Sequence, residues 1–347
     1  MGFLRGSMFG IKRSIGIDLG TANTLVYYKQ KEKIVLNEPS VVAIHKDTKK
    51  VLAVGKEARD MIGKTPDSII AVRPLKEGVI ADYDITAAMI KHFVKKILGE
   101  FPIFLPEIMI CVPIEVTGVE RRAVREAAME AGAKDVHTIE EARAAALGAG
   151  IDITAPEGSM IVDIGGGSTD IAVISLGGTV VSKSIRIAGN NFDEDIVRYV
   201  KKVHNLLIGD RTAEYVKIKI GSALPLEEPE VLEVKGRDLV TGLPKTIKLS
   251  STEVLEAIKD SLMQIVNSVK QVLEKTPPEL AADIVDKGIV MTGGGSLIRN
   301  FPKLMSNYTQ LPVALAENCL ESVVIGTGMA LDDKILNVLR EINKAEK

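Results

Sequence analysis

The stretch that decides the fold is Met160-Ile161-Val162-Asp163-Ile164-Gly165-Gly166-Gly167-Ser168-Thr169-Asp170. An apolar run leads into an aspartate and then into a turn of glycines and hydroxyl-bearing residues. A second apolar run, Ile171 to Ile174, follows the turn. This order predicts a β-hairpin that has a glycine-rich tip and an aspartate near the end of its first strand.

The same plan occurs near the start of the chain, in Ile15-Gly16-Ile17-Asp18-Leu19-Gly20-Thr21-Ala22-Asn23, with Leu25 to Tyr28 as the second strand. A third apolar strand, Gly288 to Thr292, ends in Gly293-Gly294-Gly295-Ser296. Similar hairpins in the two halves of the chain predict a duplicated architecture. Strand-like stretches alternate with helix-like ones, which places the fold in the α/β class.

Capping boxes mark the start of two long helices. Thr117 followed by Glu120 predicts a helix that ends at Gly132, and Ser250 followed by Glu253 predicts one that ends before Pro277. The second helix carries an apolar face with helical spacing, which indicates core packing. Its members are Leu255, Ile258, Leu262, Ile265, Val269 and Leu273.

The composition of the chain limits the classes of function that it can have. A chain of 347 residues is long enough for about two domains. The formal net charge is −2, with no long block of Lys and Arg, so we expect no nucleic-acid partner. Cys111 and Cys319 lie far apart in apolar surroundings and are expected to be buried, in a reducing cytosol, with no Cys/His metal site. No apolar run is long enough to cross a bilayer.

The glycine-rich tips suit a phosphate chain. Glycine lets successive backbone N–H groups converge on an anion, and the hydroxyls of Thr21 and Ser168 and the amide of Asn23 add donors. Asp18 and Asp163 precede the tips, where they can hold water on a divalent cation. One such turn is more often only a hairpin, but the ordered pair predicts a clamp on a polyphosphate with Mg²⁺.

Two other nucleotide signatures are absent. The segment Gly63-Lys64-Thr65 ends like a P-loop, but Ala58 stands where its first glycine is required. The dinucleotide fingerprint G-x-G-x-x-G does not follow the first strand.

These features resemble the superfamily of actin, sugar kinases and heat-shock chaperone ATPases, and within it the MreB/Mbl family of bacterial cell-shape proteins. The resemblance covers nearly the whole chain, and four further strings carry it. They are Asn37-Glu38-Pro39-Ser40-Val41-Val42, Arg73-Pro74-Leu75-Lys76-Glu77-Gly78-Val79-Ile80-Ala81-Asp82, Ile208-Gly209-Asp210-Arg211-Thr212-Ala213-Glu214 and Thr276-Pro277-Pro278-Glu279-Leu280.

The resemblance implies an α/β fold of duplicated actin-like (ribonuclease-H-like) domains, with four subdomains around a central nucleotide cleft. Domain I would comprise 1–149 and 327–347, with a small subdomain at about 43–84. Domain II would comprise 150–326, with a small subdomain at about 192–256.

The implied activity is ATP binding and slow hydrolysis with Mg²⁺, coupled to assembly into double protofilaments on the inner face of the cytoplasmic membrane. Such filaments organise cell-wall synthesis and maintain rod shape. The implied partners are other copies of the chain, a membrane-anchored adaptor and the peptidoglycan synthesis machinery.

The resemblance also assigns residues to the site. Glu141 is expected to orient the attacking water, with the Ser168 hydroxyl as its partner. Carried over from the family, or predicted above from the turns, the ATP/ADP-binding residues are Asp18, Gly20, Thr21, Ala22, Asn23, Asp163, Gly165, Gly166, Gly167, Ser168, Glu214, Lys217, Gly293, Gly294, Gly295, Ser296 and Leu297.

Two positions depart from the family pattern. Ala142 stands where the family has proline, and Ser168 stands where it has threonine, which leaves the hydrolysis rate open. Without the family, Glu140 and Glu141 would be interpreted as a cap for the alanine-rich helix Ala142 to Ala149.

Two apolar segments predict contact with a membrane. The first, Phe3 to Arg13, mixes apolar and basic residues and is either an anchor helix or a disordered tail, since Gly6 and Gly10 weaken a helix. The second, Phe101 to Pro106, matches the position of the loop that the family inserts into lipid; a buried connection is the alternative. The membrane residues are predicted to be Phe3, Leu4, Phe9, Phe101, Ile103, Phe104 and Leu105.

Two other functions fit the same fold class. A small-molecule kinase would need a catalytic aspartate facing an acceptor hydroxyl, and no distinctive motif provides one. A chaperone ATPase would need a substrate-binding domain, and little chain remains after Gly328 for it.

Overall fold

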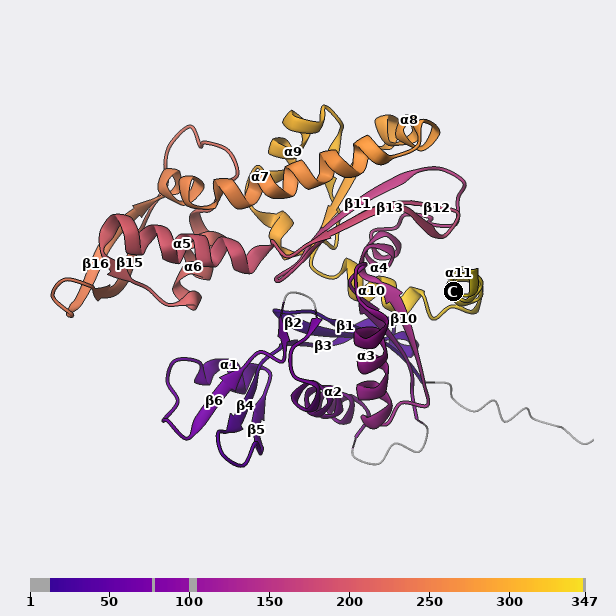
Figure 1. The fold of residues 1–347 in the computed structure, drawn as a ribbon, viewed down its shortest axis with the longest axis horizontal. Coiled ribbons are helices and arrows are strands. Elements are labelled where there is room, and N and C mark those ends of the chain that lie inside the picture. The colour runs from indigo at the N-terminus through magenta and orange to yellow at the C-terminus, as the bar shows by residue number, and fades with distance from the viewer. Residues whose placement is uncertain (1–12, 77–78, 100–104, 346–347) are drawn as a thin grey trace, which may run out of the picture.

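The computed structural model describes residues 13–76, 79–99 and 105–345. Two five-stranded sheets dominate it (Figure 1). The first has the order β10-β9-β1-β2-β3 and the second the order β13-β12-β11-β17-β18. The strands of the first are β1 (Ser14–Leu19), β2 (Asn23–Tyr28), β3 (Lys33–Pro39), β9 (Glu107–Val112) and β10 (Asp135–Glu140). Those of the second are β11 (Ser159–Ile164), β12 (Thr169–Ser175), β13 (Gly178–Ile185), β17 (Ile289–Thr292) and β18 (Val313–Leu315).

The two sheets share one topology. In each, three consecutive strands form an antiparallel meander, and two later strands add in parallel on the side of the first strand. The predicted glycine-rich hairpins are β1–β2 and β11–β12, so both hairpins and the duplicated architecture are confirmed.

Helices cover the sheets in layers (Figure 1). One core joins the first sheet to α2 (Tyr83–Leu98) and α3 (Gly118–Glu130). Another joins the second sheet to α5 (Gly189–His204), α7 (Ser251–Lys275), α8 (Pro278–Lys287) and α9 (Phe301–Thr309). Between the two sheets lie α4 (Glu141–Gly148) and α10 (Ser322–Met329), and α11 (Asp333–Ala345) follows at the end of the molecule.

A smaller sheet accompanies each large one. The first is β5-β4-β6, formed by β4 (Val42–His45), β5 (Val51–Val54) and β6 (Ile69–Val72) and packed on α1 (Lys56–Met61). The second is β14-β15-β16, formed by β14 (Leu206–Leu207), β15 (Val231–Asp238) and β16 (Pro244–Ser250) beside α6 (Asp210–Ile220). Short elements complete the chain: β7 (Leu75–Lys76), β8 (Val79–Ile80), and the 3-10 turns η1 (Lys29–Lys31) and η2 (Gly294–Leu297).

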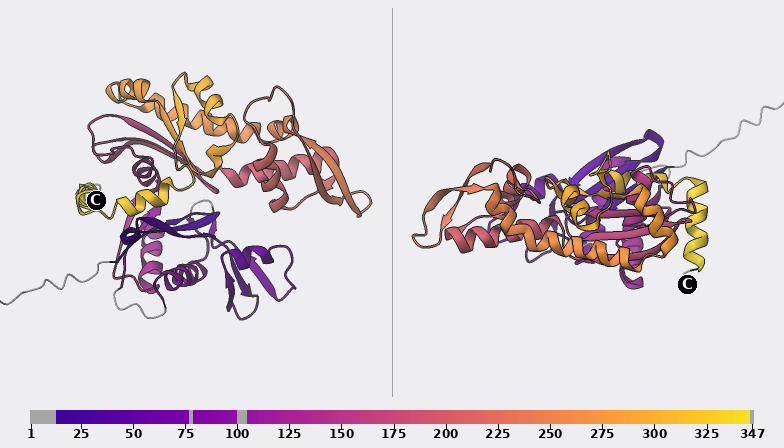
Figure 2. Two further views of the ribbon diagram at one scale, coloured as in Figure 1. Left: turned by 180° about the vertical axis from the view of Figure 1, so that it is seen from behind. Right: turned by 90° about the horizontal axis from the view of Figure 1, so that it is seen from above.

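Seen from above, the molecule is flat, with β15 and β16 at one end and α11 at the other (Figure 2).

The two predicted capping boxes are confirmed. The Thr117 side chain accepts from the Glu120 N–H at the start of α3, and the Ser250 side chain accepts from the Glu253 N–H at the start of α7. The apolar face of α7 packs into the second core as predicted; Leu255 and Leu273 lie at its edge, and Val254, Val266 and Val272 complete it.

The joint between the halves depends on glycine. A Cβ atom on Gly148 of α4 would lie 1.7 Å from the Ser322 carbonyl oxygen, and one on Gly326 of α10 would lie 1.8 Å from the Ala144 carbonyl oxygen. Because both neighbours are backbone atoms, the two helices can pack this closely only without side chains at these positions.

We expect Gly326→Ala to lower the free energy of unfolding by about 1–3 kcal/mol, because α4 and α10 must separate to admit the methyl group. Gly118→Ala is the matched control, since a Cβ atom at Gly118 has no heavy atom within 4 Å. Chemical denaturation measures both, and equal stabilities for the two variants would contradict this account of the joint.

Candidate functional site

The tips of the two glycine-rich hairpins touch. A Cβ atom on Gly166 would lie 2.8 Å from the Ala22 Cβ, and one on Gly167 would lie 2.6 Å from the Thr21 Oγ1. None of Gly165, Gly166 and Gly167 has a positive φ. Glycine is therefore needed here so that the two tips can approach closely, and not for a left-handed backbone. Positive φ occurs instead in the third loop, at Gly293 (φ 82°).

A cavity of about 560 Å³ opens beside the touching tips. It is lined by both tips, by the loop after β17, by the start of α5 and by α6. The structure brings together at this cavity Asp18, Gly20, Thr21, Ala22, Asn23, Glu141, Asp163, Gly165, Gly166, Gly167, Ser168, Glu214, Lys217, Gly293, Gly294, Gly295 and Leu297. These residues come from five separate parts of the sequence and both halves of the fold.

Ser296 is the one predicted cofactor residue that does not line the cavity. Its side chain is fully buried, and its hydroxyl donates to the carbonyl oxygen of Thr292, one turn earlier. The hydroxyl therefore closes the turn after β17 and does not face a ligand.

The start of α5 is a part of the site that the sequence analysis missed. The Gly189 N–H donates to the Gly165 carbonyl oxygen at 3.1 Å, and the Asn190 N–H donates to the Gly166 carbonyl oxygen at 2.8 Å. A helix N-terminus behind the second tip favours an anion there. The small polar run Gly189-Asn190-Asn191, just before an amphipathic stretch, was the available signal.

Other lining residues had no such signal, because they flank the predicted positions or, from Cys319 on, come from a later part of the chain. They are Leu25, Ile218, Gly221, Ile298, Arg299, Cys319, Leu320 and Val323. Cys111 and Cys319 are buried free thiols, as predicted. The Cys111 thiol lies beneath the first tip and donates to Asp18 Oδ1 at 3.3 Å.

Buried carboxyl groups dominate the electrostatics. Burial raises the pKa of Asp18 to about 6, against the Cys111 hydrogen bond, which lowers it. Burial likewise raises the pKa of Asp163 to about 7, although the hydroxyl of Thr292 donates to Asp163 Oδ1 at 2.8 Å and lowers it. Asp170, opposite Asp163 in the hairpin, has its pKa raised by burial to about 6.

Glu140 and Glu141 have different surroundings although they are adjacent. Glu140 turns away from the cavity and accepts hydrogen bonds from Arg143 Nε at 3.0 Å and Thr179 Oγ1 at 2.8 Å. Glu141 lines the cavity at the start of α4, and burial together with the neighbouring Asp170 raises its pKa well above the usual range. Glu140 therefore makes a structural contact, whereas Glu141 faces the cavity.

The carboxyl groups fit a bound cation. Among the described residues, the basic side chains that line the cavity are Lys217 and Arg299. Lys217 already pairs with Asp193 at 2.8 Å, and Arg299 pairs with Glu230 at 2.6 Å. The negative charge of Asp18 and Asp163 is thus left for a divalent ion, whose preferred ligands are carboxylate oxygens and water.

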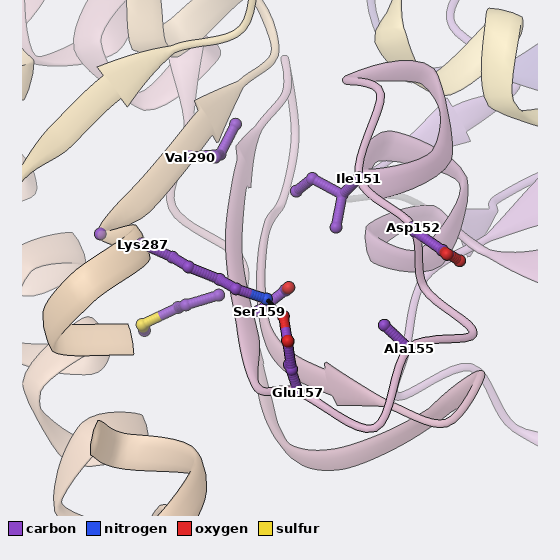
Figure 3. A pocket seen from close by; sticks show the side chains of 9 residues that line it. Ile151, Asp152, Ala155, Glu157, Ser159, Lys287 and Val290 are labelled. Carbon is purple, nitrogen blue, oxygen red and sulfur yellow. Dashed lines mark ion pairs between the residues drawn. The ribbon is translucent and has the colours of Figure 1, made fainter. Parts of the chain in front are cut away.

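A second, smaller pocket of about 270 Å³ lies where β11 and β17 begin, among residues that include Ile151, Ser159 and Val290 (Figure 3). Lys287 extends across it to pair with Glu157. It contains none of the predicted site residues.

Most of the predicted membrane residues fall outside the described chain. These are Phe3, Leu4, Phe9, Phe101, Ile103 and Phe104. Leu105 is described and is 49% exposed. In the described part of the chain, no helix is both long enough and apolar enough to span a bilayer.

The duplicated sheets and the cavity between them define an actin-like protein. The crystal structure of MreB5 of Spiroplasma citri bound to ADP matches with a TM-score of 0.89 and 42% identity, over 95% of this chain and 99% of that one. The structure of the same protein bound to AMPPNP matches equally well. The structure described as a MamK double helical filament, 24% identical with a TM-score of 0.79, covers 93% of this chain and 99% of that one and shares the fold.

The chain belongs to the MreB/Mbl family. The family model described as MreB/Mbl protein matches residues 12–337. The cell shape-determining protein Mbl of Bacillus subtilis is 52% identical over 321 residues, which cover 92% of this chain and 96% of that protein. The cell shape-determining protein MreB of Escherichia coli is 50% identical over 323 residues, which cover 92% and 93%.

The raised pKa of Asp163 makes stability depend on pH. Between the unfolded value of 3.8 and the folded value of about 7, the folded state binds more protons than the unfolded chain, so the free energy of unfolding falls as the pH rises. We expect Asp163→Asn, which keeps an acceptor for Thr292, to raise the melting temperature of the ligand-free protein at pH 8 by on the order of 2–5 °C.

The rise in melting temperature caused by Asp163→Asn should be smaller at pH 5, where Asp163 of the folded wild type is already protonated. Thermal melts of both proteins at pH 5 and pH 8 measure it. An equal difference at the two pH values would show that Asp163 does not titrate in this window.

Proposed function

We propose that this protein binds ATP, hydrolyses it slowly, and polymerises into double protofilaments on the inner face of the cytoplasmic membrane. There the filaments would organise cell-wall synthesis and maintain rod shape. The observation that carries the proposal is the cavity itself, which is lined by the two glycine-rich tips and by the carboxyl groups of Asp18, Glu141 and Asp163. The ADP and AMPPNP of the two MreB5 structures support a nucleotide as the ligand.

The phosphates would lie against the hairpin tips. Backbone N–H groups at the tips, the hydroxyls of Thr21 and Ser168 and the start of α5 all favour negative charge at this end. The ribose and adenine would then lie toward α6 and the loop after β17, beside Glu214, Lys217 and Leu297.

Asp18 and Asp163 would hold Mg²⁺ through water. Bound there, the ion would neutralise charge on the phosphates and lower the pKa values of the carboxyl groups around it. Both carboxyl groups are poorly solvated, and the basic side chains that line the cavity, Lys217 and Arg299, are paired elsewhere, so the donor set suits this role.

Glu141 would orient the attacking water. Glu141 is the first residue of α4, so the helix fixes its backbone, and burial excludes bulk water from its carboxyl group. Ser168 is buried at the second tip, where its hydroxyl can share the water. Phosphoryl transfer relies on such positioning and on electrostatic stabilisation, so a modest rate is compatible with Ala142 and Ser168 at these positions.

Domain I would then comprise 1–149 and 327–347, and domain II 150–326. The topology supports this division, since each five-stranded sheet uses strands from one of these ranges and α10 packs back on β1 and β2 of the first sheet. The segments Phe3 to Arg13 and Phe101 to Pro106 would contact lipid, and the membrane-anchored adaptor and the peptidoglycan synthesis machinery would be recruited to the filament.

High-speed pelleting tests the proposal as a whole. We expect the protein to pellet with ATP and Mg²⁺, to stay in solution without nucleotide, to show filaments by negative stain, and to pellet further with anionic liposomes. Protein that stays in solution under every condition would contradict the filament, and phosphorylation of an added sugar would favour a kinase.

The predicted membrane contact of the second apolar segment can be tested separately. Replacing Phe101, Phe104 and Leu105 with serine should reduce liposome co-sedimentation and leave ATP-dependent pelleting without lipid unchanged, because two weak anchors bind better than one. Undiminished co-sedimentation would remove this loop from the membrane contact.

We expect Glu141→Gln to retain nucleotide binding and to slow phosphate release by at least about a hundredfold, because it leaves the water without a proton acceptor. Glu140→Gln is the neighbouring control: Glu140 contacts Arg143 and Thr179 and does not line the cavity, so hydrolysis should survive. Wild-type phosphate release by the Glu141 variant would remove this residue from the mechanism.

A further inference from the structure

Two ion pairs cross the mouth of the cleft. Arg59 Nη2 of α1 lies 3.0 Å from Glu214 Oε2 of α6, and Arg211 Nη2 of α6 lies 3.7 Å from Asp60 Oδ1 of α1. In Figure 1 these two short helices belong to the small sheets of opposite halves, and they face each other at the same end of the molecule.

The charges are arranged reciprocally. On α1, the adjacent Arg59 and Asp60 present one positive and one negative group, and on α6 the positions Arg211 and Glu214, three apart, share one helix face. Each helix therefore offers a cation to the other's anion, and a shift of one helix along the other would bring like charges together. This pattern specifies one closed arrangement of the two halves.

Glu214 connects the ion pairs to the cavity. Its side chain lines the cavity while its carboxylate is held by Arg59. One turn later on α6, Lys217 Nζ donates to the carbonyl oxygen of Gly189 and to Asp193, both in the first turns of α5. The helix α6 thus links the mouth of the cleft to the phosphate end behind the second tip.

We propose that Arg59 and Asp60 of α1 and Arg211 and Glu214 of α6 form a clasp across the cleft, in which Arg59 positions Glu214 against a bound nucleotide and both pairs slow its departure. This inference rests on the proposed function, because it concerns release from the same cavity. Arg59 and Arg211 are positioning residues, since their contacts are with Asp60 and Glu214 and neither side chain lines the cavity.

The expected effect is modest because the pairs are accessible to water. The side chains of Arg59 and Glu214 are 37% and 41% exposed, and those of Arg211 and Asp60 are 49% and 60% exposed. Exposed ion pairs contribute little and are screened by salt, so each pair should change the release rate by about two- to fivefold.

The test measures the dissociation rate of fluorescent methylanthraniloyl-ADP from the full chain with Mg²⁺, by stopped flow. Asp60→Ala, Arg211→Ala and the double variant form one cycle. All three should speed release by the same factor, because either change breaks the same pair. Arg59→Ala should also speed release, and Arg59→Ala with Arg211→Ala should approach the product of the two factors.

Three controls separate the clasp from a general loss of charge or of folding. Arg122 pairs with Glu126 on α3, away from the cleft, and Arg122→Ala should leave release unchanged. High salt should speed release from the wild type more than from Arg59→Ala with Arg211→Ala. Unaltered melting temperatures exclude unfolding as the cause.

Wild-type release rates in Arg59→Ala and Arg211→Ala would overturn the clasp while leaving nucleotide binding intact. The clasp would also be overturned if the increases in release rate for Asp60→Ala and Arg211→Ala multiplied in the double variant. The two side chains would then act independently. Absence of any binding of the fluorescent nucleotide to the wild type would instead overturn the proposed function, and the clasp with it.

Discussion

The structure depends on the contact between the two glycine-rich hairpin tips, at which the second tip has no room for side chains. Gly166 and Gly167 face Ala22 and Thr21 so closely that a Cβ atom on either glycine would overlap the opposite tip. This contact brings the ends of two separate sheets to one point, and the cavity opens beside it. Glycine is required here for close approach, because its backbone angles in the second tip are ones that other residues also adopt.

The same contact concentrates negative charge. Asp18 and Asp163 each stand just before a tip, so joining the tips brings both carboxyl groups, with Glu141 and Asp170, into one poorly solvated region. Burial raises their pKa values because a charged carboxylate loses its hydration there. This loss of hydration destabilises the fold, and carboxyl groups whose pKa values are perturbed in this way are typical of a functional site.

The two halves are joined differently at the two ends of the cleft. Behind the cavity, α4 and α10 pack through Gly148 and Gly326, where the backbones touch and a small change in distance is costly. At the mouth, α1 and α6 meet through solvent-accessible ion pairs, which can break and form at little cost. A rigid joint at the back and a weak contact at the front allow the mouth to open while the tips stay in register.

The sequence alone determined what depends on near neighbours in the chain. Apolar runs, turn glycines and capping boxes specify the hairpins and the helices α3 and α7, because the interactions behind them span only a few residues. The repeated pattern of strand, aspartate and glycines was enough to predict a duplicated fold with a phosphate clamp. The family resemblance added Glu141, Glu214, Lys217 and Leu297, which also line the cavity.

Only the tertiary structure decided which way individual side chains point and which distant elements meet. The start of α4 turns Glu140 toward Arg143 and Glu141 into the cavity, and a tight turn directs Ser296 to Thr292. The position of Cys319 and the pairing of α1 with α6 follow from the packing of whole sheets. Local sequence patterns carry no information on these contacts, because their partners are brought together only by the folded chain.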